Sequence, residues 1–313
     1  MTPSEREQRT ALIVNPLSAR GRWLRTPALR ELIRGEFPGR VHDEARDKSG
    51  MIDLARRLSL ENDVLVVMGG DGTLADVQRG IAEAGRLSDV VLGIIPLGSG
   101  NGLRSSLAIP KHIRKAIRIV RTGVIKPIDL IEIDGHIANF ISIGATAKAT
   151  YWKSRSTIPG LLGHTLASRT MFTYHRKITD IELFDGLDDK GRAFEHKALR
   201  LKLYDCIINK ANYFGYNWLI SPKARLDDGF LDVTLFDIRA YSYLVYYPLI
   251  YLGQYQRILK HYKVKRLIVR GKELHIQYNG EAMPIRDEVE IKVLPKALRF
   301  IAPQKPRGGK QKI

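Results

Sequence analysis

Short apolar runs alternate with helical patterns over the first third of the chain. Three continuous apolar runs indicate buried strands, at residues 11–14, 64–68 and 90–95. Elsewhere apolar residues recur every three or four positions, as on one face of a helix, at residues 24–33, 52–58, 74–81 and 113–120. This alternation predicts a parallel sheet with helices on its faces, whose functional loops lie beyond the carboxyl ends of the strands.

The pattern changes near residue 123. Apolar runs of strand length now follow one another, at residues 128–133, 137–143, 178–184, 199–207 and 230–236. Turn signals such as Asp134-Gly135 and Lys190-Gly191 separate them, which is typical of hairpins. We therefore predict an α/β domain over residues 1–126, a mostly antiparallel β-rich domain over 127–287 and a basic, disordered tail over 303–313.

Two glycine-rich loops each follow a predicted strand and precede a helical segment. The first is Gly69-Gly70-Asp71-Gly72-Thr73 and the second is Gly98-Ser99-Gly100-Asn101-Gly102. Glycine permits a tight turn and close approach of the backbone to a ligand, and a helix N-terminus offers free N–H groups that suit phosphate. Neither loop matches the phosphate-loop or dinucleotide pattern. Together they predict the floor and wall of a nucleotide cleft.

The aspartate of the first loop has more than one interpretation. Asp71 could hold a divalent cation or accept a proton from a hydroxyl nucleophile. It could equally cap the helix that follows, as could Thr73. A third segment, residues 15–22, closes the first strand; its Ser18 and arginines could reach phosphate, although a plain turn explains it as well.

These motifs occur in an order that resembles the catalytic domain of the diacylglycerol kinase, sphingosine kinase and ceramide kinase superfamily. The ordered set begins with Asn15-Pro16 and Ser18, continues with the two glycine loops, and extends over residues 10–302. In the second domain, residues 221–224 (SPKA) and 226–233 (LDDGFLDV) are similar to a stretch of the soluble bacterial members. Asn279-Gly280-Glu281 stands where the family usually has Asp-Gly-Glu.

The resemblance implies a lipid kinase that transfers the γ-phosphoryl group of ATP, with Mg²⁺, to a lipid hydroxyl. It also implies a β-sandwich-like second domain, an active site in the cleft between the domains and a segment, 288–302, that returns to complete the first domain. Asp71 and Glu281 would be the catalytic carboxylate residues. The nucleotide would contact Asn15, Ser18, Gly69, Gly70, Gly72, Thr73, Gly98, Ser99, Gly100 and Asn101.

Two departures from the family pattern affect these assignments. Gly102 stands where bacterial diacylglycerol kinases commonly have an acidic residue, so the second loop looks more like the sphingosine and ceramide kinase version. Asn279 replaces an aspartate, and an asparagine cannot serve as a general base. The general base is then Asp71 or Glu281.

Asp227 and Asp228 are further candidate metal ligands besides Asp71. The resemblance implies that they help to bind a structural Mg²⁺, as in some soluble bacterial members. Paired aspartates are also common in turns that begin a strand, and this explanation stays open.

The charge of the chain favours an anionic partner. There are 51 lysine and arginine residues against 33 aspartate and glutamate residues, a formal net charge of +18. The longest apolar stretch, residues 243–253, contains Pro248 and is too short to span a membrane. A buried core element or a segment at a membrane interface would explain it. We expect a cytoplasmic protein held at anionic membranes mainly by charge.

Three functions are compatible with these features. The first is a lipid kinase acting on a diacylglycerol, sphingoid base or ceramide at a membrane surface. The second is an enzyme like NAD kinase, which phosphorylates a soluble nucleotide and shares the Gly-Gly-Asp-Gly-Thr motif. The third is a basic protein without catalysis that binds membranes or nucleic acid; we expect no specific nucleic-acid partner. The particular lipid and the oligomeric state stay open.

Overall fold

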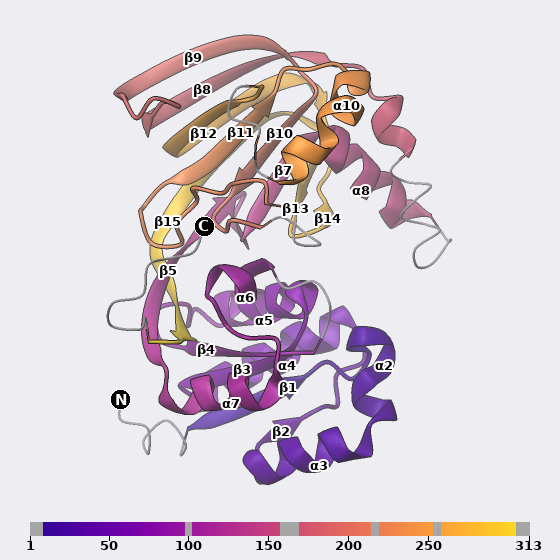
Figure 1. Cartoon of the computed structure of the whole chain (residues 1–313), viewed down its shortest axis with the longest axis vertical. Coiled ribbons are helices and arrows are strands. Elements are labelled where there is room, and N and C mark those ends of the chain that lie inside the picture. The colour runs from indigo at the N-terminus through magenta and orange to yellow at the C-terminus, as the bar shows by residue number, and fades with distance from the viewer. Residues whose placement is uncertain are drawn as a thin grey trace. The chain divides into compact units, whose positions relative to one another are not determined.

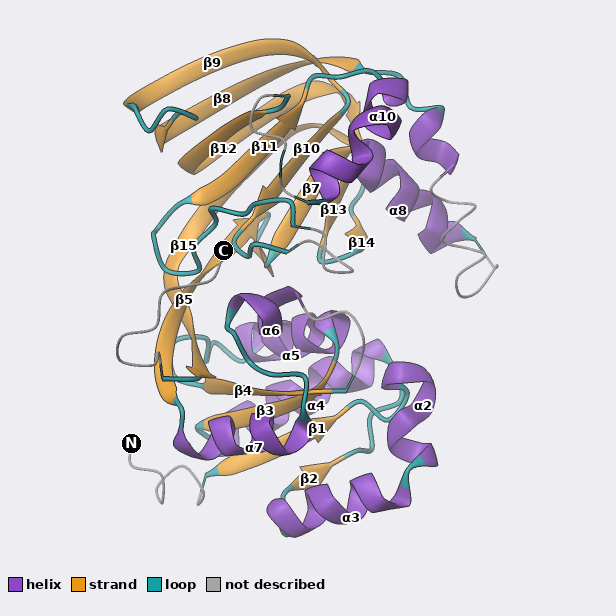
Figure 2. Cartoon of the chain, in the orientation of Figure 1, coloured by secondary structure: helices purple, strands orange, loops and turns teal. Residues whose placement is uncertain are grey.

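The computed structural model describes residues 9–97, 102–156, 169–213, 219–252, 254 and 258–304. The chain divides into two compact units, one of residues 1–128 with 296–313 and one of residues 129–295. Figure 1 shows the elements in chain order and Figure 2 their types. The sequence placed the domain boundaries at 126 and 287, whereas the units divide after residues 128 and 295.

A parallel sheet forms the centre of the first unit. Its order is β15-β4-β3-β1-β2, and every pairing is parallel. The bounds are β1 Thr10–Val14, β2 Val41–His42, β3 Val64–Gly69, β4 Val91–Pro96 and β15 Arg286–Ala302. All residues of β1, β3 and β4 are buried, which explains why these strands are continuous apolar runs without alternation.

Six helices accompany these strands within the described part of the first unit. They are α2 Ser18–Arg25, α3 Pro27–Glu36, α4 Lys48–Glu61, α5 Asp71–Glu83, α6 Gly102–Ser106 and α7 Ile113–Thr122. Local chemistry sets their ends: the Asp47 carboxylate accepts a hydrogen bond from Gly50 N at 2.8 Å and caps α4, and Pro27 begins α3. The predicted α/β architecture is confirmed.

The last strand belongs to both units. Near its start β15 pairs with β12, for example Lys292 with Arg266. Near its end it pairs in parallel with β4, through Arg299 with Val91 and Phe300 with Leu92. The end of the described chain therefore adds a strand next to β4 in the first sheet.

The strand pairs of the second unit whose register is defined are all antiparallel. Its 15-residue strand β12 has β8 along one edge, and first β11 and then β15 along the other. Isoleucine, leucine and valine from these strands form one buried core. The prediction of a mainly antiparallel second domain is confirmed.

The remaining bounds follow the chain. The strands are β5 Val124–Ile133, β6 His136–Ala138, β7 Phe140–Gly144, β8 Lys177–Leu187, β9 Ala193–Leu203, β10 Asp205–Asn209, β11 Leu231–Phe236, β12 Lys260–Leu274, β13 Ile276–Tyr278 and β14 Glu281–Ala282. The helices are α8 Ala145–Arg155 and α10 Ala240–Tyr251.

The apolar stretch at residues 243–253 lies largely in helix α10, and it is not simply a core element. Tyr243 is buried among aromatic residues of the second unit. Tyr241, Val245, Leu249 and Leu252, however, are between 40% and 69% exposed. The interpretation as a buried core segment is therefore wrong for this face of the helix. No helix among the described residues is long and apolar enough to cross a membrane.

Helices α4 and α5 approach each other closely at Gly80. A Cβ atom built there would lie 2.3 Å from the Ile52 carbonyl oxygen and 2.8 Å from the Ala55 Cβ. We expect Gly80→Ala to lower the free energy of unfolding by about 1–3 kcal/mol, because overpacking outweighs the better helix propensity of alanine. Urea unfolding measures this change.

Gly35→Ala is the matched control. Gly35 is an exposed helical glycine of α3 with no atom within 4 Å of a built Cβ. This variant should gain about 0.4–1 kcal/mol of stability. Equal stabilisation by both substitutions would contradict the close packing of α4 on α5.

Candidate active site

The first glycine loop joins strand β3 to helix α5 at the carboxyl edge of the parallel sheet. Gly70 precedes the helix, and Asp71 is its first residue. A Cβ at Gly69 would lie 2.6 Å from both Cβ and Oγ1 of Thr73, because the Thr73 side chain folds back over the end of the strand. Glycine is thus required at position 69 by contact with the turn that follows.

Thr73 connects this loop to the end of strand β1. Asn15 Nδ2 donates a hydrogen bond to Thr73 Oγ1 at 3.0 Å, and Ser18 Oγ lies 3.4 Å from the same oxygen. The Asn15 carboxamide oxygen accepts from Leu17 N at 3.0 Å, which orients the amide. The structure therefore brings together three residues expected at the nucleotide, Asn15, Ser18 and Thr73.

The backbone after Ser18 has an unusual conformation. Ala19, Arg20 and Gly21 all have positive φ angles, of 51°, 59° and 73°. For alanine and arginine this region costs conformational energy, and such residues cluster at functional sites. The strained turn lies beside the Asn15–Thr73 contact, at the edge where the glycine loop ends.

Asp71 links the first glycine loop to helix α6. Its Oδ2 atom accepts a hydrogen bond from Gly102 N at 3.0 Å. Burial raises the pKa of the Asp71 carboxyl above its ordinary value, while the N–H groups of Gly102 and Leu103 and the charge of Arg104 act in the opposite direction. The remaining residues expected in the second loop, Gly98, Ser99, Gly100 and Asn101, lie outside the described residues.

Arg104 is a residue of this region that the sequence did not single out. Its side chain is buried, and its guanidinium donates to the Ile109 carbonyl and to Ser105 Oγ. The signal in the sequence that could have identified Arg104 is a basic residue two positions after the second glycine loop. Arg104 braces the turn after α6 and contributes positive charge near Asp71.

The donor set of Asp71 is compatible with magnesium. Mg²⁺ is usually held by one or two carboxylates together with substrate phosphates and water. Asp71 supplies one carboxylate at the loop. Over the described ranges, no cluster of three or more His, Cys, Asp or Glu side chains could hold a metal by itself. A cation at this loop would have Asp71 as a protein ligand, with phosphate oxygens and water as further ligands.

Glu281 and Asn279 lie in the β13–β14 hairpin of the second unit. Asn279 and Gly280 have φ angles of 49° and 88°, as the two-residue turn requires. The Asn279 amide accepts from Asn139 N at 2.9 Å and donates to the Ile137 carbonyl at 3.3 Å. An aspartate could not make the second bond, which explains asparagine here. The approach of Glu281 to the glycine loops stays a prediction.

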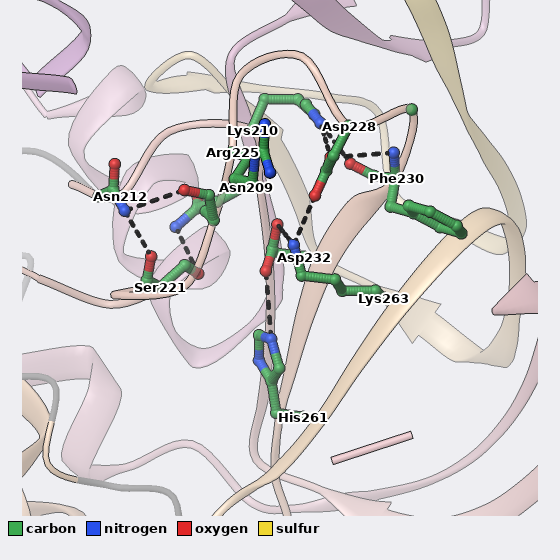
Figure 3. Close-up of polar contacts among 12 residues, drawn as sticks. Asn209, Lys210, Asn212, Ser221, Arg225, Asp228, Phe230, Asp232, His261 and Lys263 are labelled. Atoms are coloured by element: carbon green, nitrogen blue, oxygen red, sulfur yellow. Dashed lines mark hydrogen bonds and ion pairs between the residues drawn. The ribbon is translucent and has the colours of Figure 1, made fainter. Parts of the chain in front are cut away.

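The paired aspartates of the second unit have different environments. The Asp227 side chain is more than half exposed and lies 3.4 Å from the Arg225 guanidinium. Asp228 accepts hydrogen bonds from two lysine ammonium groups, Lys210 at 2.9 Å and Lys263 at 2.6 Å, one on each carboxylate oxygen (Figure 3). Both side chains thus lie beside basic groups, and their role as ligands of a structural Mg²⁺ stays a prediction.

Comparison with protein families gives two matches that together cover most of the chain. Residues 9–133 match the diacylglycerol kinase catalytic domain. Residues 142–302 match the YegS C-terminal NAD kinase beta sandwich-like domain. The two matches follow each other in the order of the two units.

Curated proteins of similar sequence are named as lipid kinases. The chain is 26% identical over 230 residues to a diacylglycerol kinase of Staphylococcus saprophyticus, which covers 73% of this chain and 72% of the relative. It is 27% identical over 222 residues to a probable lipid kinase, YegS-like, of Klebsiella pneumoniae, which covers 69% of this chain and 71% of the relative.

Solved structures share the fold. A diacylglycerol kinase of Bacillus anthracis superposes with a TM-score of 0.66 at 19% identity, covering 96% of this chain and 97% of that one. A putative diacylglycerol kinase of the same organism gives a TM-score of 0.71 at 20% identity, covering 94% and 97%. With the two domain matches and the strand-end glycine loop, the chain belongs to the diacylglycerol kinase family of lipid kinases, which use ATP.

Proposed function

We propose that this enzyme phosphorylates the free hydroxyl of a diacylglycerol-type lipid. The observation that carries the proposal is a pair of hydrogen bonds at the strand ends. Asn15 donates to Thr73, and Gly102 N donates to Asp71. Together they position one half-buried carboxylate beside a glycine loop. The relatives named diacylglycerol kinase support this acceptor over a sphingoid base or ceramide. The glycine at position 102 is the feature that argues for the other acceptors.

In this proposal the glycine loops hold the phosphates of ATP. Backbone N–H groups of Gly70, Gly72 and Thr73 at the start of α5 suit an anionic group, as do the side chains of Asn15 and Ser18. Positioning and charge neutralisation account for most of the catalysis of phosphoryl transfer. Mg²⁺, when bound, would neutralise phosphate charge, and Asp71 would be its protein ligand if Glu281 is the base.

The reaction itself is a direct transfer. The lipid hydroxyl oxygen forms a bond to the γ-phosphorus, the bond from that phosphorus to the bridging oxygen breaks, and ADP leaves with the electron pair. Asp71 accepts the hydroxyl proton, or Glu281 does so with Asp71 bound to the cation. Burial raises the pKa of the Asp71 carboxyl above its ordinary value, which makes this carboxylate a stronger base than an exposed aspartate.

An assay with labelled ATP tests the acceptor. Wild-type protein is incubated with Mg²⁺ and, in separate reactions, dispersed diacylglycerol, sphingosine, ceramide and NAD. We expect label in phosphatidic acid. Label in a sphingolipid phosphate would change the acceptor, and label in NADP alone would contradict a lipid kinase acting on diacylglycerol.

Asp71→Asn separates catalysis from folding. The substitution keeps the shape and the acceptor for Gly102 N but removes the charge, so we expect turnover to fall by about 10²-fold or more. Stability should not fall. The Asp71 carboxyl has a higher pKa in the folded than in the unfolded protein, so ionising it lowers the free energy of unfolding as the pH rises between these two pKa values. Asparagine does not ionise, so the variant lacks this loss of stability at neutral pH.

Glu83→Gln is the control for this substitution. Glu83 lies at the other end of α5, where it pairs with Arg79 at the surface. Its loss should leave turnover within about twofold and stability within about 0.5 kcal/mol. An Asp71→Asn enzyme that kept more than about a tenth of wild-type turnover would exclude Asp71 as both base and essential metal ligand.

The proposed membrane contact has an apolar part as well as a charged one. Tyr241, Val245 and Leu249 are four residues apart and exposed, so they share one face of α10. No charged residue occurs in 240–253. Trp152 of α8 is also exposed, between Lys148 and Arg155, and Figure 2 shows α8 and α10 at the same side of the second unit. A lipid bilayer suits an apolar face with basic neighbours.

Vesicle co-sedimentation tests whether an apolar contact adds to the expected attachment, which is mainly by charge. At 1 M salt the Debye length is only ~3 Å, so charge attraction is screened and the apolar contact persists. Wild-type protein should therefore keep part of its binding to anionic vesicles at 1 M salt. Val245→Asp with Leu249→Asp should abolish that part, because each side chain contributes ~1.5 kcal/mol or more when buried.

Leu24→Asp with Leu60→Asp is the matched control, since both leucines are exposed helical residues of the first unit. This variant should bind like wild type. Binding that disappears completely at 1 M salt in wild-type protein would show that attachment is electrostatic alone.

A further inference from the structure

The side chain of Lys210 is almost completely buried, 1% exposed, just after strand β10. Its ammonium donates to Asp228 Oδ1 at 2.9 Å and to the Phe230 carbonyl, and lies 3.0 Å from Asp129 Oδ2. Figure 3 shows Lys210 directed at Asp228 and Phe230. An ammonium has three N–H donors, and here three oxygens surround it, two as hydrogen-bond acceptors and one as an ion-pair partner.

The three oxygens around the Lys210 ammonium come from separate parts of the chain. Asp129 belongs to β5, whereas Asp228 and Phe230 belong to the turn before β11. Gly229 N in that turn also donates to Asp129 Oδ2 at 2.7 Å. Two carboxylates and one carbonyl arranged in this way are the donor types that a hard divalent cation prefers. Lys210 therefore joins distant segments as a structural metal ion does.

A second ammonium completes the local charge balance. Lys263 of β12 donates to Asp228 Oδ2 at 2.6 Å and lies 3.6 Å from the buried Asp232 carboxylate. Burial raises the pKa of Asp228, but the hydrogen bond from Lys263 and the charge of Lys210 more than offset this and lower it. Both oxygens of Asp228 are thus occupied by fixed positive charge.

We propose that Lys210 is a built-in cation, whose ammonium takes the place that a divalent ion would otherwise fill between Asp129, Asp228 and the Phe230 carbonyl. A metal ion bound to the same oxygens would overlap the ammonium and add a like charge in a buried site. Folding of the second unit then needs no divalent cation. This inference does not depend on the proposed lipid or on the role of Asp71.

Thermal unfolding of the nucleotide-free wild-type protein gives the first test. A site filled at 100 times its Kd would raise the Tm by about 5 °C or more. We expect no such difference between EDTA and 5 mM Mg²⁺, Mn²⁺ or Ca²⁺. A rise of that size that Asp71→Asn removes would come from the glycine loop and support the proposal. A rise that Asp228→Asn removes and Asp71→Asn leaves would overturn it.

Lys210→Ser gives the second test, because it removes the ammonium and keeps the oxygens of Asp129, Asp228 and Phe230 that could bind a divalent cation. In EDTA we expect its Tm to fall by about 5 °C or more, since two buried carboxylates lose their partner. Mg²⁺, Mn²⁺ or Ca²⁺ should restore at least half of this loss. An unchanged Tm in EDTA, or a loss that none of the three ions restores, would contradict the role of Lys210 as a stand-in cation.

Lys263→Met is the matched control. It also removes an ammonium from Asp228, but it leaves Lys210 in place. Its Tm should fall without any recovery in divalent cations, whereas recovery equal to that of Lys210→Ser would contradict the assignment of the site to Lys210. If Lys210→Ser does not fold, the wild-type measurement still decides.

Discussion

The parallel pairing of β1, β3 and β4 is the constraint on which the candidate active site depends. It brings the ends of strands far apart in sequence to one edge, where hydrogen bonds can fix their loops against one another. Thr73 accepts a hydrogen bond from the Asn15 amide, and Asp71 accepts one from Gly102 N. A single carboxylate is thus buried enough to have a raised pKa and still stands at the start of a helix that suits phosphate.

The sequence predicted the features whose signals are local. Continuous apolar runs identified the buried parallel strands, and glycines after β3 identified the loop, because close contact with Thr73 leaves no room for a Cβ at Gly69. Long-range pairings could not be predicted in this way. Nothing in the local pattern relates Asp129 to Lys210, and the exposed face of α10 has the composition of a core helix.

Fixed charges perform two different tasks in the two units. In the first, one carboxylate lies beside a loop whose backbone N–H groups suit an incoming anion, so a cation there would come with the nucleotide. In the second, lysine ammonium groups already neutralise Asp129 and Asp228. Because these lysines and aspartates cancel each other, they contribute nothing to the formal net charge of +18.

A crystal structure with Mg²⁺ and a non-hydrolysable ATP analogue tests the central claim most directly. The account predicts that the terminal phosphates contact the backbone N–H groups at residues 70–73 and the side chains of Asn15 and Thr73. Asp71 should face the metal or the γ-phosphate. Phosphates bound elsewhere, with the first glycine loop making no contact to the nucleotide, would contradict it.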